Sequence, residues 1–288
     1  MHVFVTGATG WVGSAIVEDL IQAGHQVSGL ARSADKAAHL AAMGAEIVHG
    51  SLDDLDLLRD AASDADAVIH TAFNHDFSRF LDSAAQDERS IEALGSALAH
   101  SDRPLLVTSG LYGLPRGATE ADVPNPASPR RSETTARALA EGGLCAATVR
   151  LAPSVHGIGD RGFIPIVVRL ARETGVSAYP EDGSNCWSGV YRTDAARVYR
   201  LALEQGVTER VYHAVAEEAV QFRTIAEVIG RQLGLPVESR PRDHFGWFAN
   251  WATANMAASS ACTRSLLGWH PTGPGLLADL GQPGYYAS

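Results

Sequence analysis

Thr6-Gly7-Ala8-Thr9-Gly10-Trp11-Val12-Gly13 is the stretch of sequence that decides the fold. A short apolar run at residues 3–5 precedes it, and apolar residues recur at helical spacing over residues 12–21 behind it. The sequence therefore predicts a strand, a tight turn and a helix in immediate succession.

The three glycines of this turn have separate roles. Gly7 allows the tight turn, Gly10 lets the backbone approach a pyrophosphate, and Gly13 lets the helix lie close to the strand. The helix amino terminus then points at the phosphates. We expect a dinucleotide to be bound by residues of this turn, namely Gly7, Thr9, Gly10, Trp11, Val12 and Gly13. The alternative is a purely structural turn with an empty site.

The same order of elements repeats along the chain. Predicted strands cover residues 27–30, 47–48, 67–70, 105–108 and 147–151, and predicted helices cover 33–42, 54–62, 78–99 and 129–141. Strands that alternate with helices of this length indicate right-handed crossovers and a parallel sheet. The predicted fold class is therefore α/β, with a doubly wound, mostly parallel Rossmann sheet and a small carboxyl-terminal substrate lobe.

Proline and glycine mark where the chain leaves the sheet. They concentrate at residues 113–129 and again at 153–165. We predict a cofactor-binding domain over 1–155, to which 188–215 returns, and a substrate lobe formed by 156–187 and 216–288. Because ligands bind beyond the carboxyl ends of parallel strands, segments 71–75, 109–117 and 152–160 should face one cleft.

Composition excludes several classes of partner. The formal net charge of −10 disfavours nucleic acid and anionic membranes. No apolar run has the length of a membrane span, the first residues read as a strand rather than a signal peptide, and the three cysteines have no metal-ligand spacing. We expect a cytoplasmic protein with reduced thiols, no bound metal and a small-molecule substrate.

The end of the second predicted strand indicates which nicotinamide nucleotide is bound. Selectivity for the unphosphorylated form usually rests on Asp or Glu at this point. Here the strand runs into Arg32 and Ser33, with Lys36 one helical turn later. Cations without a carboxylate suit a 2′-phosphate, so we predict NADP(H) as the cofactor. The alternative is that Arg32 and Lys36 are solvated charges at an ordinary helix start.

Several segments together resemble the extended or atypical branch of the short-chain dehydrogenase/reductase superfamily, which includes the NAD-dependent epimerase/dehydratase proteins. They are the glycine turn, 50–53, Asp66-Ala-Val-Ile-His-Thr-Ala72, Thr108-Ser-Gly-Leu-Tyr-Gly113, Arg150-Leu-Ala-Pro-Ser-Val-His-Gly157, 191–196 and 267–271. The resemblance implies that further residues line the cofactor, namely Ser51, Leu52, Thr71, Ala72, Phe73, Thr108, Pro153 and Val155. It also implies that Ser109 is the active-site serine, the alternatives being Thr108 in that role or a Ser109 that only caps the following turn, and that helices 78–99 and 129–141 pair in a homodimer.

One part of the family pattern is missing. The family uses a tyrosine as proton donor and a lysine four residues later on the same helix face. Here the two possible frames give Arg130 with Thr134 or Arg131 with Thr135, and the only lysine in the chain is Lys36. A general acid is typically worth about 10²–10⁴-fold in rate, so the loss has to be explained.

Three explanations are open. Another group, Ser109, Tyr112 or His156, replaces the tyrosine; or the substrate is a protonated imine that needs no donor; or the protein binds cofactor without turnover. Glu133 is expected to form exposed helix salt bridges with Arg130 and Arg137, although one of Arg130, Arg131 and Glu133 could touch ribose or substrate.

The leading hypothesis is an NADP(H)-dependent oxidoreductase that transfers hydride to or from a C=O or C=N group of a small, partly apolar substrate. The aromatic residues of segment 244–251 either roof the substrate pocket, form a dimer contact or pack within the lobe. The alternatives are a non-catalytic NADP(H)-binding sensor and, less favoured, a nucleotide-sugar epimerase or dehydratase.

Overall fold

The computed structural model describes residues 1–76 and 79–287, which form two compact units. Unit 1 comprises Met1–Ser109, Pro124–Arg150 and Ala196–Tyr212. Unit 2 comprises Gly110–Val123, Leu151–Ala195 and the chain from His213 onward. The return to the first unit is narrower than the predicted 188–215, because residues 186–191 form a strand that pairs within unit 2.

Unit 1 carries a seven-stranded sheet in the order β10-β6-β5-β4-β1-β2-β3. The pairs β1–β2, β1–β4, β2–β3 and β4–β5 are parallel, so the predicted fold class is confirmed. The strands are β1 (His2–Thr6), β2 (Gln26–Ala31), β3 (Glu46–His49), β4 (Ala67–His70), β5 (Leu105–Gly110), β6 (Ala146–Leu151) and β10 (Val211–Ala214). The strand order reverses between β1 and β4, and ligands of such sheets bind at this switch point.

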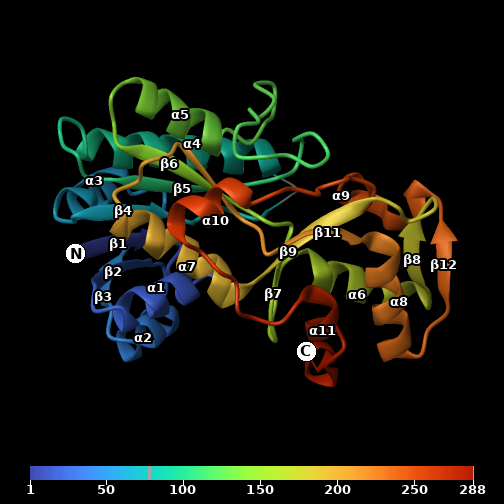
Figure 1. The fold of residues 1–288 in the computed structure, drawn as a ribbon. Helices are drawn as coiled ribbons and strands as arrows, with labels where there is room; N and C mark the ends of the chain where they lie inside the picture. Colours follow the sequence, from blue (N-terminus) through green and yellow to red (C-terminus); the bar gives the residue numbers. More distant parts are fainter. Residues whose placement is uncertain (77–78, 288) are drawn as a thin grey trace. The chain divides into compact units, whose positions relative to one another are not determined.

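Helices cover both faces of this sheet (Figure 1). One face carries α3 (Leu55–Ser63), α4 (Phe80–Ala97) and α5 (Ser132–Glu141), and the other carries α1 (Trp11–Gln22) and α2 (Ala34–Ala42). Apolar side chains from α3, α4 and α5 bury a core against the strands, including Leu58, Ile91, Leu94, Val68 and Val107. Strands buried on both faces explain the near-continuous apolar runs of the sequence. The first residue of the predicted helix 78–99, Ser78, lies outside the described residues.

Unit 2 has two small sheets. β9 (Cys186–Tyr191) lies between β7 (Ser154–His156) and β11 (Glu217–Gln221), and β8 (Ser177–Pro180) pairs in parallel with β12 (Val237–Arg240). The helical segments are α6 (Phe163–Thr174), α7 (Arg192–Glu204, which ends in unit 1), α8 (Phe222–Leu233), η2 (Arg242–Phe248), α9 (Ala249–Ala252), α10 (Ala261–Leu267), α11 (Leu276–Leu280) and η3 (Pro283–Tyr286).

The core of unit 2 is strongly aromatic. Trp187, Phe222 and Phe248 are fully buried in it, and Phe163 packs against them with ring centroids 5.4–5.9 Å from Phe248 and Trp187. Segment 244–251 thus contributes to the packing of its own unit, while Trp247 remains half-exposed. Among the residues that the structure describes, no helix is both long and apolar enough to cross a membrane.

Candidate functional site

The glycine turn joins β1 to α1 at the switch point and leaves no room for a Cβ at Gly7 or Gly13. Gly7 has φ +67°, and a Cβ there would lie 2.6 Å from the backbone nitrogen of Ala72. A Cβ at Gly13 would lie 2.1 Å from the Gly7 carbonyl oxygen. The end of β4, the turn and the first turn of α1 are therefore packed backbone to backbone, as the sequence predicts for these glycines.

The amino terminus of α1 suits a phosphate. The helix begins at Trp11 with Gly10 as the N-cap residue, and no side chain caps it. Val12 and Thr9 are half-buried beside this turn. An uncapped helix start can accept phosphate oxygens on its backbone N–H groups, so these residues fit a dinucleotide.

The residues predicted for the adenine side lie at the ends of β2 and β3. Arg32, Ser33 and Lys36 are exposed at the start of α2, and Ser33 is its N-cap residue. Ser51 is held by Asp54, which accepts hydrogen bonds from its backbone N–H at 2.7 Å and its hydroxyl at 2.9 Å. The carbonyl of the buried Leu52 accepts a hydrogen bond from Ser90 at 3.2 Å.

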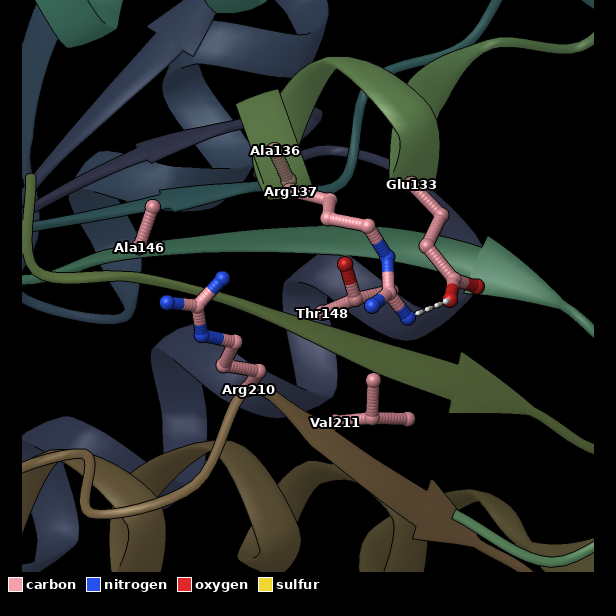
Figure 2. A pocket seen from close by; sticks show the side chains of 7 residues that line it. All are labelled: Glu133, Ala136, Arg137, Ala146, Thr148, Arg210 and Val211. Carbon is pink, nitrogen blue, oxygen red and sulfur yellow. Dashed lines mark ion pairs between the residues drawn. The ribbon is translucent and has the colours of Figure 1, made fainter. Parts of the chain in front are cut away.

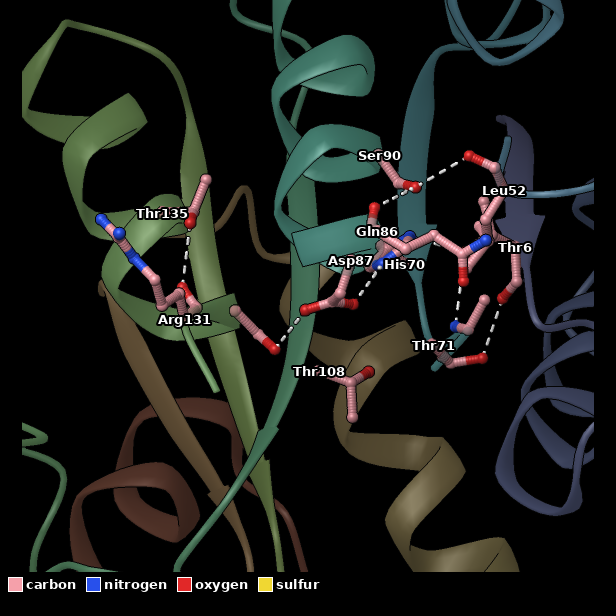
Figure 3. Close-up of polar contacts among 12 residues, drawn as sticks. Thr6, Leu52, His70, Thr71, Gln86, Asp87, Ser90, Thr108, Arg131 and Thr135 are labelled. Atoms are coloured by element: carbon pink, nitrogen blue, oxygen red, sulfur yellow. Dashed lines mark hydrogen bonds and ion pairs between the residues drawn. The ribbon is translucent and has the colours of Figure 1, made fainter. Parts of the chain in front are cut away.

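Thr71 and Ala72 follow β4 directly beside the glycine turn. The Thr71 hydroxyl donates to the carbonyl of Thr6 at 2.8 Å, which fixes the end of β4 against the end of β1 (Figure 3). Phe73 comes next, and its ring lies beneath the guanidinium of Arg130, 4.4 Å from the ring centroid.

At the end of β5, Thr108 is buried and Ser109 is half-buried. The Thr108 hydroxyl is 2.8 Å from the hydroxyl of Tyr199, and burial raises the pKa of that tyrosine. The Thr108 carbonyl accepts a hydrogen bond from Nη2 of Arg130 at 3.3 Å. Ser109 therefore follows a residue whose backbone and side chain are both held in place.

A chain of buried hydrogen bonds, here called the Arg130 network, runs through unit 1 from Thr6 to Arg130. Its other members are His70, Asp87 and Ser132, and sequence reasoning missed the roles of all three. His70 lies 2.8 Å from the Thr6 hydroxyl and 3.0 Å from Asp87 (Figure 3), and the Ser132 hydroxyl donates to Asp87 at 2.5 Å. Arg130 Nε donates to Ser132 at 3.0 Å. Burial lowers the pKa of Arg130, and the charge of Asp87 opposes that effect.

Glu133 differs from the expectation. It is 4% exposed, and its main partner is the fully buried Arg150 of β6, at 2.6 and 2.8 Å. Arg137 is a secondary partner at 3.8 Å, whereas no ion pair joins Glu133 to Arg130 within the described chain. The predicted surface pair is thus a buried, bidentate ion pair that fastens α5 to the sheet. The expected pair with Arg130 was inferred from sequence spacing within a helix that begins at 129. Because α5 begins at Ser132, Arg130 lies before the helix and not on its face.

A small pocket lies in unit 1 beside the ion pair of Glu133 with Arg137 (Figure 2). It is lined by residues of α5, β6 and the start of β10, namely Glu133, Ala136, Arg137, Ala146, Thr148, Arg210 and Val211. Of the residues considered for contact with ribose or substrate, only Glu133 lines it among those that the structure describes, and none of the residues predicted to bind the cofactor does.

The remaining candidates lie in unit 2. Pro153 is half-buried between β6 and β7, and Val155 pairs with Val190 within the small sheet. Tyr112 is 50% exposed, with its ring centroid 5.8 Å from that of Trp251.

His156 is fully buried in unit 2, and its Nδ1 lies 3.0 Å from Asp279. Its surroundings favour a structural role, because both partners are at most 2% exposed in their side chains. The His156 cluster also includes Glu217, whose carboxylate is 3.9 Å from Nε2, and the hydrogen-bonded pair of Tyr285 and Asp160 at 2.5 Å. The cluster ties α11 and η3 to the small sheet. Asp194 also has a structural role, because its carboxylate accepts hydrogen bonds from the backbone N–H groups of Thr272 and Gly273.

Comparison with known proteins identifies the lineage. Residues 3–215 match the model of the NAD-dependent epimerase/dehydratase family. The chain belongs to this family. It is 43% identical to the uncharacterized protein C2A9.02 of Schizosaccharomyces pombe, over 99% of this chain and 100% of that protein. It is 41% identical to the uncharacterized protein YLL056C of Saccharomyces cerevisiae, over 97% and 98%.

More distant relatives have assigned activities. A 2-alkyl-3-oxoalkanoate reductase of Stenotrophomonas maltophilia is 29% identical over 71% of this chain and 66% of that enzyme. Among solved structures, the dTDP-glucose 4,6-dehydratase DesIV of Streptomyces venezuelae, with NAD bound, has a TM-score of 0.78 at 21% identity and covers 99% of this chain and 97% of its own. The resemblance to the short-chain dehydrogenase/reductase superfamily is thereby confirmed.

Proposed function

We propose that this protein is an NADP(H)-dependent oxidoreductase that acts on a C=O or C=N group of a small, partly apolar molecule. The observation that carries the proposal is the glycine turn at the β1–β4 switch point, where α1 begins without a side-chain cap and where Gly7 and Gly13 leave no room for a Cβ. When bound, such a nucleotide supplies or accepts a hydride. The reductases among the relatives support the reaction class.

The preference for the phosphorylated nucleotide rests on the start of α2. Arg32 and Lys36 are both exposed there, and neither forms an ion pair with a described residue. Their charges are therefore available to a 2′-phosphate, which a guanidinium can bind in bidentate fashion. Ser109 is proposed to contribute a polar contact to the substrate, and Tyr112 remains a candidate for a second.

Calorimetric titration with NADPH and NADH tests the cofactor. We expect NADPH to bind more tightly than NADH. The double variant Arg32→Ala/Lys36→Ala should lose about tenfold or more in NADPH affinity, because hydrogen bonds to charged groups are worth about 1.5–3 kcal/mol. Its affinity for NADH should be unchanged. Arg59→Ala, which removes an exposed cation paired with Asp56 in α3, is the control. Equal affinity for both nucleotides would contradict the assignment.

Turnover is tested by following NADPH oxidation with a panel of ketones, enones and cyclic imines. Oxidation with at least one class is expected. Tight NADPH binding with no oxidation across the panel would contradict an enzymatic role and favour a cofactor-binding protein without turnover.

A further inference from the structure

Two consecutive arginines before α5 face opposite ways. Arg131 is directed outward, with its side chain 55% exposed and Nε 3.3 Å from Glu88. Arg130 turns back to the end of β5, where it donates to the Thr108 carbonyl and lies over the ring of Phe73. Of the two frames in which the family's tyrosine could be replaced, the structure therefore brings only Arg130 to the carboxyl ends of β4 and β5.

The Arg130 network holds this guanidinium in a fixed direction. A carboxylate at Asp87 only accepts, so Ser132 and His70 Nε2 both donate to it, and the Ser132 oxygen is left to accept from Arg130 Nε. In a neutral imidazole that donates from Nε2, His70 Nδ1 accepts from the Thr6 hydroxyl, whose oxygen is 3.5 Å from the backbone nitrogen of Ala72. The chain of bonds has one consistent polarity from the glycine turn to Arg130.

Arg130 is also a cation without a carboxylate in direct contact. Across residues 1–76 and 79–287 no ion pair to Arg130 is formed, and its Nη1 makes no hydrogen bond. Arg150, by contrast, is fully buried and bound in bidentate fashion by Glu133. A fixed guanidinium with a free donor next to Ser109 is complementary to an oxygen that carries negative charge.

We propose, resting on the proposed function, that the reacting group of the substrate is a carbonyl and that Arg130 stabilises the negative charge on its oxygen in place of the absent tyrosine. In the reduction, the carbonyl carbon gains a hydride from NADPH, which is oxidised to NADP⁺. The π electron pair moves to the oxygen beside Arg130, and a proton from water, which is left as hydroxide, completes the alcohol. A protonated imine is disfavoured, because its positive charge would face that of Arg130.

Binding of a charged probe tests this without a known substrate. Benzoate mimics an oxyanion on an apolar ring, and benzylammonium carries the opposite charge. Each is titrated calorimetrically into protein saturated with NADP⁺. We expect benzoate to bind the unaltered protein and Arg131→Gln equally, to bind Arg130→Gln at least tenfold more weakly, and to bind Arg130→Lys with intermediate affinity. Benzylammonium should bind more weakly than benzoate.

The outcomes separate the two proposals. Failure of the unaltered protein to bind NADP⁺ contradicts the proposed function, and benzoate is then titrated into the nucleotide-free protein, where the comparison of Arg130→Gln with Arg131→Gln still applies. Equal benzoate affinity in these two variants, no benzoate binding at all, or tighter binding of benzylammonium would each overturn the role of Arg130. Should Arg130→Gln not fold, Arg130→Lys and Ser132→Ala, which removes only the Nε acceptor, serve in its place.

Discussion

The Arg130 network of unit 1 and the His156 cluster of unit 2 are built from similar parts and differ in what they leave unpaired. Each has a hydroxyl that donates to a buried carboxylate at 2.5 Å, Ser132 to Asp87 in one and Tyr285 to Asp160 in the other. Each also has a buried histidine 3.0 Å from an aspartate. The network, however, ends in a half-buried cation without a carboxylate, whereas the cluster encloses its histidine completely.

This difference separates a candidate reactive site from a structural fastening. Buried polar groups are costly unless they are paired, and the bond from His156 Nδ1 to Asp279 is explained by the fold that it holds together, although His156 Nε2 has no hydrogen-bond partner among the described residues. A cation held by hydrogen bonds yet left without an acid is not explained by folding alone. Perturbing both regions in the same way should therefore change stability in both and ligand binding in only one.

The largest effect is expected from His156→Ala. Asp279 is 1% exposed, and the loss of His156 would leave its buried carboxylate, within the described part of the chain, with only a 3.4 Å hydrogen bond from the side chain of Gln282. We expect the free energy of unfolding to fall by about 3–5 kcal/mol, measured by urea denaturation. Affinity for NADPH in the folded fraction should not change. Unchanged stability with lost NADPH oxidation would instead give His156 the catalytic role predicted from the sequence.

Ser132→Ala and Tyr285→Phe form a matched pair, since each removes one hydroxyl donor from a buried carboxylate. Each should lower the free energy of unfolding by about 1–3 kcal/mol, because the carboxylate loses a charge-assisted bond. Only Ser132→Ala should also weaken benzoate binding, because only Ser132 orients Arg130. Loss of benzoate affinity in Tyr285→Phe would break the distinction between the two regions.

Tyr286→Phe is the control for this pair and should have a much smaller effect. The Tyr286 hydroxyl is buried and has no hydrogen-bond partner among the described residues, whereas the hydroxyl of neighbouring Tyr285 is bonded. Removing an unsatisfied buried hydroxyl is expected to leave the free energy of unfolding unchanged or slightly raised. A loss as large as that of Tyr285→Phe would mean that packing rather than hydrogen bonding dominates in η3.

The elements of unit 1 could be predicted from sequence because their signals are local. The glycine spacing, the apolar runs and the helical periodicity each lie within a few residues, and the sheet of unit 1 follows from their alternation. The partners of buried polar groups could not be predicted in this way. Arg150 is 17 residues from Glu133, and Asp279 is 123 residues from His156.

The direction of Arg130 depended on a helix boundary. A helix beginning at 129 would place Arg130 and Arg131 in its first turn, whereas α5 begins at Ser132 and leaves Arg130 in the preceding segment. Boundaries are the least certain part of any prediction from periodicity. A buried serine, aspartate and histidine on three different elements were the missing signal, and their sequence positions alone do not show that they meet.

The smallest expected effect concerns the pH dependence of unit 2. Burial raises the pKa of Asp160 above the ordinary 3.8, even though Tyr285 and the backbone N–H of Gly162 oppose the shift. The folded state then holds this proton more tightly than the unfolded state, so stability is lost as the pH rises from about the ordinary value through the raised one. Asn cannot titrate, and the stability of the unaltered protein relative to Asp160→Asn should therefore fall with rising pH.

Asp182 provides the opposite case, because hydrogen bonds from Ser184 lower its pKa. The stability of the unaltered protein relative to Asp182→Asn should therefore rise with pH. Urea unfolding between about pH 2 and 7, which covers carboxyl titration both below and above the ordinary pKa, measures both slopes. Slopes of the same sign would contradict the assignment of Asp160 to a desolvated position inside the His156 cluster.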